Sequence, residues 1–127
     1  VTEVIFVKEG DDRVFVIVDG TMNDLIRPTL YDAYHEVRPV NIARGFSART
    51  TADIVGPVCE SGDYLAKGRE MPKPRPGDLL ALGSAGAYGA VQAGTYNSRG
   101  RRRHSISRRP VFRDGSRQSL GTRTTRL

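Results

Sequence analysis

Short runs of β-branched and aromatic residues, separated by turn-forming residues, constrain the fold of this chain most strongly. Residues 2–8 and 13–19 are rich in Val, Ile and Phe, and residues 9–12 (EGDD) lie between them. This pattern predicts a β-hairpin, because Gly and Asp accept the backbone conformations of a tight turn. The second run is apolar throughout rather than alternating, which predicts a strand buried on both faces.

Three later segments also have the character of strands. Residues 33–40 alternate between apolar and polar, which indicates one solvent-exposed face and makes His35 a half-exposed strand residue. Residues 51–57 have the pattern of a buried strand, and residues 79–82 form a further apolar run. We therefore expect a mainly β fold, either a β-sandwich or an open Greek-key-like barrel with short helical turns.

Two short segments are predicted to be helical turns. Residues 27–31 contain Pro28, which fits only the first turn of a helix, and Asn23 or Asp24 can cap a short turn here. Residues 64–66 form the second predicted turn.

The remaining segments are predicted to be connections or an edge. Residues 41–50 are polar and indicate a loop. Residues 70–78 contain three closely spaced prolines, which remove backbone donors and predict an exposed connection. Residues 91–97 are predicted to continue as a strand or a sheet edge.

The charge is distributed unevenly. Residues 98–127 hold ten arginines and one acid, so they carry +9 and leave residues 1–97 at −3, within a net charge of +6. Such a basic segment can bind nucleic-acid phosphates. However, Phe112 is its only aromatic residue for stacking on bases, and a solvated, disordered run is the usual state of this composition. We therefore do not expect nucleic acid as a partner.

Cys59 is the only cysteine, which excludes an internal disulfide and gives no reason to expect an oxidising compartment. No apolar run approaches the ~20 residues of a membrane span, and the start shows no signal-peptide pattern. We expect a cytoplasmic protein without a membrane partner. The Cys and His spacing matches no zinc site, so no metal is expected. The chain opens on Val1 inside a predicted strand and without an initiator Met, so we expect either an N-terminus made by cleavage or a missing upstream part.

A thiol and a carboxylate stand together at Cys59 and Glu60, between the predicted strand 51–57 and a Ser-Gly-Asp turn. A tight turn at the end of a strand can direct such a pair into a polar pocket. The alternative interpretation is that Cys59 is a small buried hydrophobic residue.

Three further residues are candidates for binding an anion. Arg27 and Tyr31 are four residues apart, on one face of a helical turn, and a guanidinium beside a phenol suits a carboxylate or a phosphate. The alternative is a stacked surface pair. Tyr88 lies in the glycine-rich residues 83–90, where the backbone can approach a ligand and the hydroxyl can point outward. The alternative is a core tyrosine at a barrel corner.

Three stretches combine into a resemblance: residues 18–31, residues 55–63, and residues 84–89 together with residues 96–99. In this order and spacing they resemble the C-terminal domain of the diaminopimelate decarboxylases. These enzymes belong to the alanine-racemase-like, pyridoxal-phosphate-dependent decarboxylases. The resemblance covers about residues 1–99.

The resemblance implies a two-domain enzyme in which a (β/α)8 barrel, missing from this chain, holds pyridoxal 5'-phosphate. The implied reaction removes a carboxylate from meso-2,6-diaminopimelate, a small amino-acid substrate, to give L-lysine, with the cofactor ring as electron sink. The implied assembly is a homodimer with the active site at the interface.

The resemblance also implies a role for each candidate residue. Arg27 and Tyr31 would hold substrate or phosphate oxygens, and Tyr88 would contact the cofactor or the substrate. Glu60 would reach across the dimer interface to the distal ammonium of the substrate. Cys59 would lie near the reacting carbon as a proton donor.

Two departures from the family shape these expectations. The three lysines, Lys8, Lys67 and Lys73, do not match the lysine that binds the cofactor, so the chain alone is expected to be inactive. From Gly100 the sequence turns to Arg, Ser, Thr and Gly. We therefore expect residues 1–99 to be an incomplete β domain and residues 100–127 to be an Arg-rich tail, disordered or frame-shifted.

Two other functions stay open from the sequence. One is a domain of a related decarboxylase acting on ornithine, arginine or carboxynorspermidine. The other is a small basic nucleic-acid-binding protein.

Overall fold

The computed structural model describes residues 1–41 and 48–100. Most of the loop predicted at residues 41–50, and all of the predicted tail beyond Gly100, lie outside the described residues. Strands dominate the described part, with two short helices and one 3-10 turn. In chain order the elements are β1 (Thr2–Glu9), β2 (Val14–Val18), α1 (Arg27–Tyr31), β3 (Val37–Pro39), β4 (Arg49–Val55), β5 (Tyr64–Pro72), β6 (Leu79–Leu82), α2 (Gly86–Gly89) and η2 (Tyr96–Ser98).

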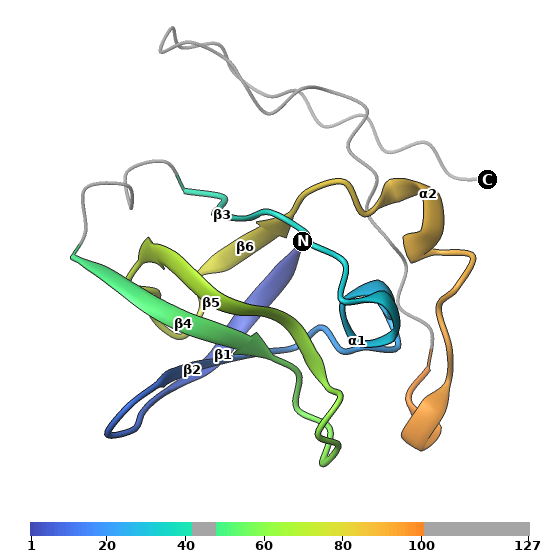
Figure 1. Cartoon of the computed structure of the whole chain (residues 1–127), viewed down its shortest axis with the longest axis horizontal. Coiled ribbons are helices and arrows are strands. Elements are labelled where there is room, and N and C mark those ends of the chain that lie inside the picture. Colours follow the sequence, from blue (N-terminus) through green and yellow to red (C-terminus); the bar gives the residue numbers. More distant parts are fainter. Residues whose placement is uncertain (42–47, 101–127) are drawn as a thin grey trace, which may run out of the picture.

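The strands of the described part form one six-stranded sheet in the order β3-β6-β1-β2-β4-β5. The pair β2 and β4 is parallel, whereas the other neighbouring strands are antiparallel. The edge strands β3 and β5 contact each other, so the sheet curls into a nearly closed barrel (Figure 1). Of the two predicted architectures, the barrel is confirmed.

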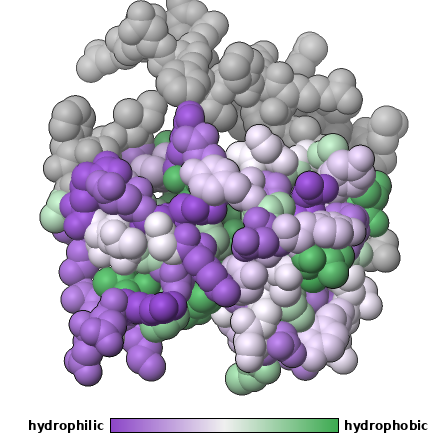
Figure 2. All heavy atoms as spheres, viewed as in Figure 1, coloured by the Kyte–Doolittle hydropathy of each residue, from purple (hydrophilic) through white to green (hydrophobic). Residues whose placement is uncertain are grey.

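The core lies inside the curled sheet. Val4, Val16, Val18 and Ile54 are at most 1% exposed and pack together as one cluster. The prediction that β2 is buried on both faces is wrong, because the intervening residues of this strand are only half-buried. On the outer surface, apolar residues form separate patches between polar ones (Figure 2).

The predicted hairpin and the first helical turn are confirmed. β1 and β2 pair antiparallel, and α1 begins with Pro28 in its first turn. The predicted cap is wrong for this helix, because its N-cap is Ile26, without a side-chain hydrogen bond. The Asp24 carboxylate instead accepts a hydrogen bond from the Thr21 backbone N–H, at 3.0 Å.

The other helical turn was predicted at residues 64–66, and this prediction is wrong. These residues begin β5, where Ala66 pairs with Ile54 of β4. Residues 91–97 also differ from prediction, because they form a turn and enter η2 rather than a strand. In both places long-range contacts, which a short sequence window does not contain, decide the backbone conformation.

His35 is not the half-exposed strand residue that alternation predicts. β3 begins only at Val37, and the His35 side chain is 3% exposed. Its Nδ1 atom lies 3.0 Å from the carbonyl oxygen of Gly83. The segment before β3 therefore packs against the end of β6 with its histidine inward.

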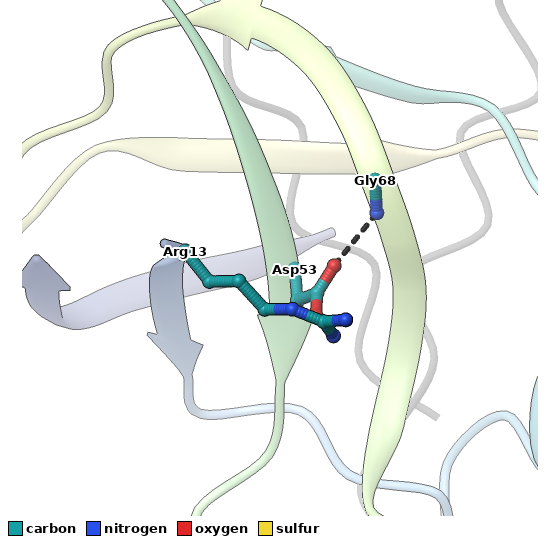
Figure 3. A network of polar contacts seen from close by, with 3 residues as sticks. All are labelled: Arg13, Asp53 and Gly68. Carbon is teal, nitrogen blue, oxygen red and sulfur yellow. Dashed lines mark hydrogen bonds and ion pairs between the residues drawn. The ribbon is translucent and has the colours of Figure 1, made fainter. Parts of the chain in front are cut away.

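A polar contact fixes the outside of the sheet. The Asp53 carboxylate on β4 accepts a hydrogen bond from the Gly68 N–H at 2.7 Å and pairs with Arg13 at 3.4 Å (Figure 3). Gly68 has φ of +59°, a left-handed conformation that glycine adopts without a steric penalty. Because the Arg13 side chain is 69% exposed, the ion pair itself adds little stability.

Candidate functional site

The loop before α1 and the loop that carries Cys59 are joined by one buried carboxylate. Asp63 is 3% exposed, and its two oxygens accept hydrogen bonds from the N–H groups of Met22 and Val58, both at 2.7 Å. Hydrogen bonds to an ionised group are among the stronger ones in proteins. The two loops therefore form one structural unit.

Helix α1 is also bonded directly to that second loop. The Thr29 hydroxyl donates to the carbonyl of Gly62, and the Tyr64 hydroxyl donates to the carbonyl of Pro28 at 3.2 Å. The helix has only five residues, too few to be stable alone. These contacts therefore position its side chains.

The third sequence motif joins the same unit through Asn23. This residue is 7% exposed, and its Nδ2 donates to the carbonyl of Tyr96 at 2.8 Å. The backbone carbonyl of Asn23 accepts a hydrogen bond from the Gly94 N–H at 2.9 Å. All three motifs that carry the resemblance therefore meet on one side of the barrel, where α1 and α2 lie (Figure 1).

Arg27 lies between two tyrosine rings. Its guanidinium carbon is 5.8 Å from the centroid of Tyr31 and 5.1 Å from the centroid of Tyr88, both within the range of a cation–π contact. The two tyrosines are 59% and 53% exposed, so the alternative of a core position for Tyr88 is wrong.

The same three side chains have unused binding capacity. Within residues 1–41 and 48–100, Arg27 forms no ion pair, and neither Tyr31 nor Tyr88 uses its hydroxyl in a hydrogen bond. A guanidinium with two free phenols beside it provides the charge and the donors that a phosphate or a carboxylate binds. This Arg27 cluster, defined as Arg27, Tyr31 and Tyr88, is the strongest candidate for an anion site.

Cys59 and Glu60 lie on the surface of their loop. The Cys59 thiol is exposed and unpaired, so the interpretation as a buried hydrophobic residue is wrong. The Glu60 carboxylate accepts a hydrogen bond from the Gly62 N–H at 3.2 Å and a longer one from the Tyr96 hydroxyl at 3.4 Å. Sequence reasoning missed Tyr96 and Asp63 as site residues, although both stand inside the quoted motifs.

A hollow of about 370 Å3 opens beside this loop, on the outer side of the sheet. Glu60, Tyr64 and Lys67 line it, and the Lys67 ammonium lies 3.7 Å from the centroid of the Tyr64 ring. None of the three residues of the Arg27 cluster lines the hollow. The structure thus places Arg27 against both Tyr31 and Tyr88. Glu60 lines the separate hollow, and Cys59 is exposed on the same loop as Glu60.

Residues 1–41 and 48–100 contain no group of three or more His, Cys, Asp or Glu side chains arranged to hold a metal ion. Among the same residues, no helix has the length and the apolar character needed to cross a membrane.

Comparison with known proteins relates this geometry to a family. Residues 1–86 match the model of the pyridoxal-dependent decarboxylases, specifically its C-terminal sheet domain. The chain is 54% identical over 99 residues to a diaminopimelate decarboxylase from Zymomonas mobilis, a match that covers 77% of this chain and 23% of that protein. The chain therefore spans about a quarter of the length of the curated relatives it matches.

Solved structures give the same result. A crystal structure of an Aquifex aeolicus protein has a TM-score of 0.75 at 48% identity, covering 79% of this chain and 24% of the other. A diaminopimelate decarboxylase from Helicobacter pylori, solved in complex with L-lysine, has a TM-score of 0.71 at 43% identity, with the same two coverages.

Proposed function

Since this chain belongs to the pyridoxal-dependent decarboxylases, through the C-terminal sheet domain of that family, we propose that it supplies this domain to a diaminopimelate decarboxylase. The whole enzyme would convert meso-2,6-diaminopimelate to L-lysine in the cytoplasm. The observation that carries the proposal is the Arg27 cluster, a guanidinium between two exposed phenols, in a chain 54% identical to such an enzyme. Residues 1–99 form the proposed domain.

The Arg27 cluster fits the cofactor that the family implies. Pyridoxal phosphate carries a phosphate dianion, and the substrate carries carboxylates, both of which suit an arginine with neighbouring hydroxyl donors. The bound cofactor supplies the electron sink for loss of the carboxylate. In our proposal, Arg27 and Tyr31 hold substrate or phosphate oxygens, and Tyr88 contacts the cofactor or the substrate.

The lysine that binds the cofactor is proposed to come from an upstream barrel domain. Of the lysines in this chain, Lys73 forms an ion pair with Glu9 at 2.5 Å, and Lys67 lies over the Tyr64 ring. The chain alone is therefore proposed to be inactive.

Cys59 and Glu60 are proposed to act in the active site of a second subunit. A carboxylate held by Gly62 and Tyr96 is suited to bind the distal ammonium of diaminopimelate, and an exposed thiol can deliver a proton to the reacting carbon. Glu60 lines a hollow that no residue of the Arg27 cluster lines, which supports this arrangement, since in a two-fold dimer one chain can contribute residues to both sites.

The test replaces the sheet domain of the Zymomonas mobilis enzyme with residues 1–99 of this chain. The purified chimera, supplied with pyridoxal phosphate, is assayed for L-lysine formation from meso-diaminopimelate. We expect lysine formation, and we expect Arg27→Ala to abolish most of it. The matched control is Arg75→Ala, which removes an exposed arginine outside the three motifs.

Two outcomes would contradict the proposal. One is a folded, cofactor-loaded chimera that forms no lysine. The other is equal activity of the Arg27→Ala and Arg75→Ala variants. Ornithine, arginine and carboxynorspermidine are assayed in parallel, and faster turnover of any of them would favour the related decarboxylases.

A further inference from the structure

His35 is a buried histidine to which the proposed function gives no role. Its side chain is 3% exposed, and Nδ1 lies 3.0 Å from the carbonyl oxygen of Gly83. Because a carbonyl oxygen can only accept, the proton of this contact must sit on Nδ1. The other ring nitrogen, Nε2, is buried and has no hydrogen-bond partner among the described residues. Leaving a buried nitrogen without a hydrogen-bond partner is unfavourable, and an apolar side chain at this position would not do so. The Nδ1–H donor is therefore the feature that distinguishes histidine here.

The contact joins the two segments that carry the Arg27 cluster. His35 follows α1 after the left-handed residue Asp32, which caps that helix at φ of 52°. Gly83 directly follows β6 and precedes Ser84, which is also left-handed at φ of 53°; α2 with Tyr88 comes next. The bond thus ties the exit of one helix to the entrance of the other.

The segment around His35 makes three further contacts. The Gly83 N–H donates to the carbonyl of Glu36 at 2.8 Å, so both backbone groups of Gly83 are bonded to residues 35 and 36. The Glu36 carboxylate is engaged by Arg38 at 2.6 Å. Tyr34, the residue before His35, contacts β5: the guanidinium of Arg69 lies 3.8 Å from the centroid of its ring.

We propose that His35 is a positioning residue that sets the distance between Arg27 on α1 and Tyr88 on α2. It acts through the proton on Nδ1, which it donates to the carbonyl oxygen of Gly83. Neither short helix has a side-chain cap, so their relative placement depends on such connections. The inference rests on the proposed function at one point only, which is that the Arg27 cluster is treated as a binding site. The relative placement of α1 and α2 is a property of the chain, whatever the cluster binds.

The first test uses NMR of the whole 127-residue chain at neutral pH and does not depend on any change at His35. Imidazole nitrogen shifts report which nitrogen carries the proton. The only other histidine is His104, so His104→Asn leaves a single imidazole to assign. We expect the Nδ1–H tautomer at His35. A proton on Nε2 with none on Nδ1 would overturn the proposal.

The second test compares three replacements of His35 by the nuclear Overhauser contact between the Arg27 side chain and the Tyr88 ring. In His35→Asn, the amide nitrogen stands one bond beyond Cγ, as Nδ1 does, so we expect the contact to be retained. His35→Gln carries the same amide one bond farther out, and His35→Leu has no donor, so both should lose it. Cross-strand contacts between β1 and β2 serve as the internal reference for folding.

The proposal is overturned if His35→Leu or His35→Gln keeps the Arg27–Tyr88 contact, or if His35→Asn loses it while the sheet is intact. If the leucine variant does not fold, the asparagine–glutamine comparison decides. None of these readouts involves decarboxylation, so failure here is separate from failure of the proposed function, which the chimera assay measures.

Discussion

The buried carboxylate of Asp63 accepts a hydrogen bond from the backbone N–H of Met22 at 2.7 Å, across 41 residues of sequence. Its second oxygen accepts from Val58 at the same distance. Through these two bonds, the loop carrying Cys59 and Glu60 is built onto the loop that leads into α1. The geometry of the candidate site therefore depends on a residue that need not contact a ligand.

Replacing Asp63 by asparagine should destabilise the fold by about 2–3 kcal/mol, because one buried N–H then faces an amide NH2 instead of a carboxylate oxygen. Urea unfolding of the whole chain measures the change. Asp11→Asn, in the exposed β1–β2 turn, is the matched control and should change stability by less than about 0.5 kcal/mol. Equal stability of the two variants would show that the Asp63 contacts are not needed.

Gly56→Ala should be more damaging than Asp63→Asn. A Cβ at Gly56 would lie 2.2–2.5 Å from the carboxylate atoms of Asp63, so the carboxylate must leave both of its N–H donors. We expect loss of folding or a destabilisation above about 3 kcal/mol by circular dichroism melting. Gly86→Ala is the control, since nothing lies within 4 Å of its Cβ and alanine favours a helix.

Thr29→Val tests the attachment of α1 to the Cys59 loop. Valine has nearly the same shape, so the change chiefly removes the hydroxyl that donates to Gly62. We expect a loss of about 1 kcal/mol and faster amide exchange in α1. The matched change Thr51→Val, at an exposed position of β4, should have neither effect. Unchanged exchange in α1 would mean that this bond does not hold the helix.

Glu60→Gln, in the chimera described above, should lower kcat/KM for diaminopimelate by about 10- to 100-fold, since a neutral amide binds an ammonium more weakly than a carboxylate does. Steady-state kinetics measure the change, with Glu3→Gln on β1 as the control. The proposed role of Glu60 fails if the two variants have the same kcat/KM.

Local signals predicted the parts of the fold that depend on nearby residues. The hairpin follows from its Gly-Asp-Asp turn, and α1 follows from Pro28, because both sets of constraints lie within a few residues. β5 was missed at its start because residues 64–66 pair with β4, which a short window does not reveal. The parallel pairing of β2 with β4 likewise has no local signature.

The sequence draws attention to the three residues of the Arg27 cluster, but not to Asp63 or Tyr96, and not to how these residues are arranged. Spacing suggested that Arg27 and Tyr31 share a face, whereas the approach of Tyr88 depends on how the barrel brings α2 to α1. Alternation predicts that His35 lies on a solvent-exposed strand face, because its partner, Gly83, is 48 residues away in the sequence. A buried polar contact of this kind follows from tertiary packing, and alternation alone does not encode it.

The most direct measurement of the central claim is a crystal structure of the chimera with pyridoxal phosphate and L-lysine bound. We predict that Arg27 and Tyr31 contact the phosphate or the lysine carboxylate, and that Glu60 of the neighbouring subunit lies about 3 Å from a lysine amino group. Lysine bound with the Arg27 cluster and Glu60 both directed away from it would contradict the claim that this sheet domain helps to form the substrate site.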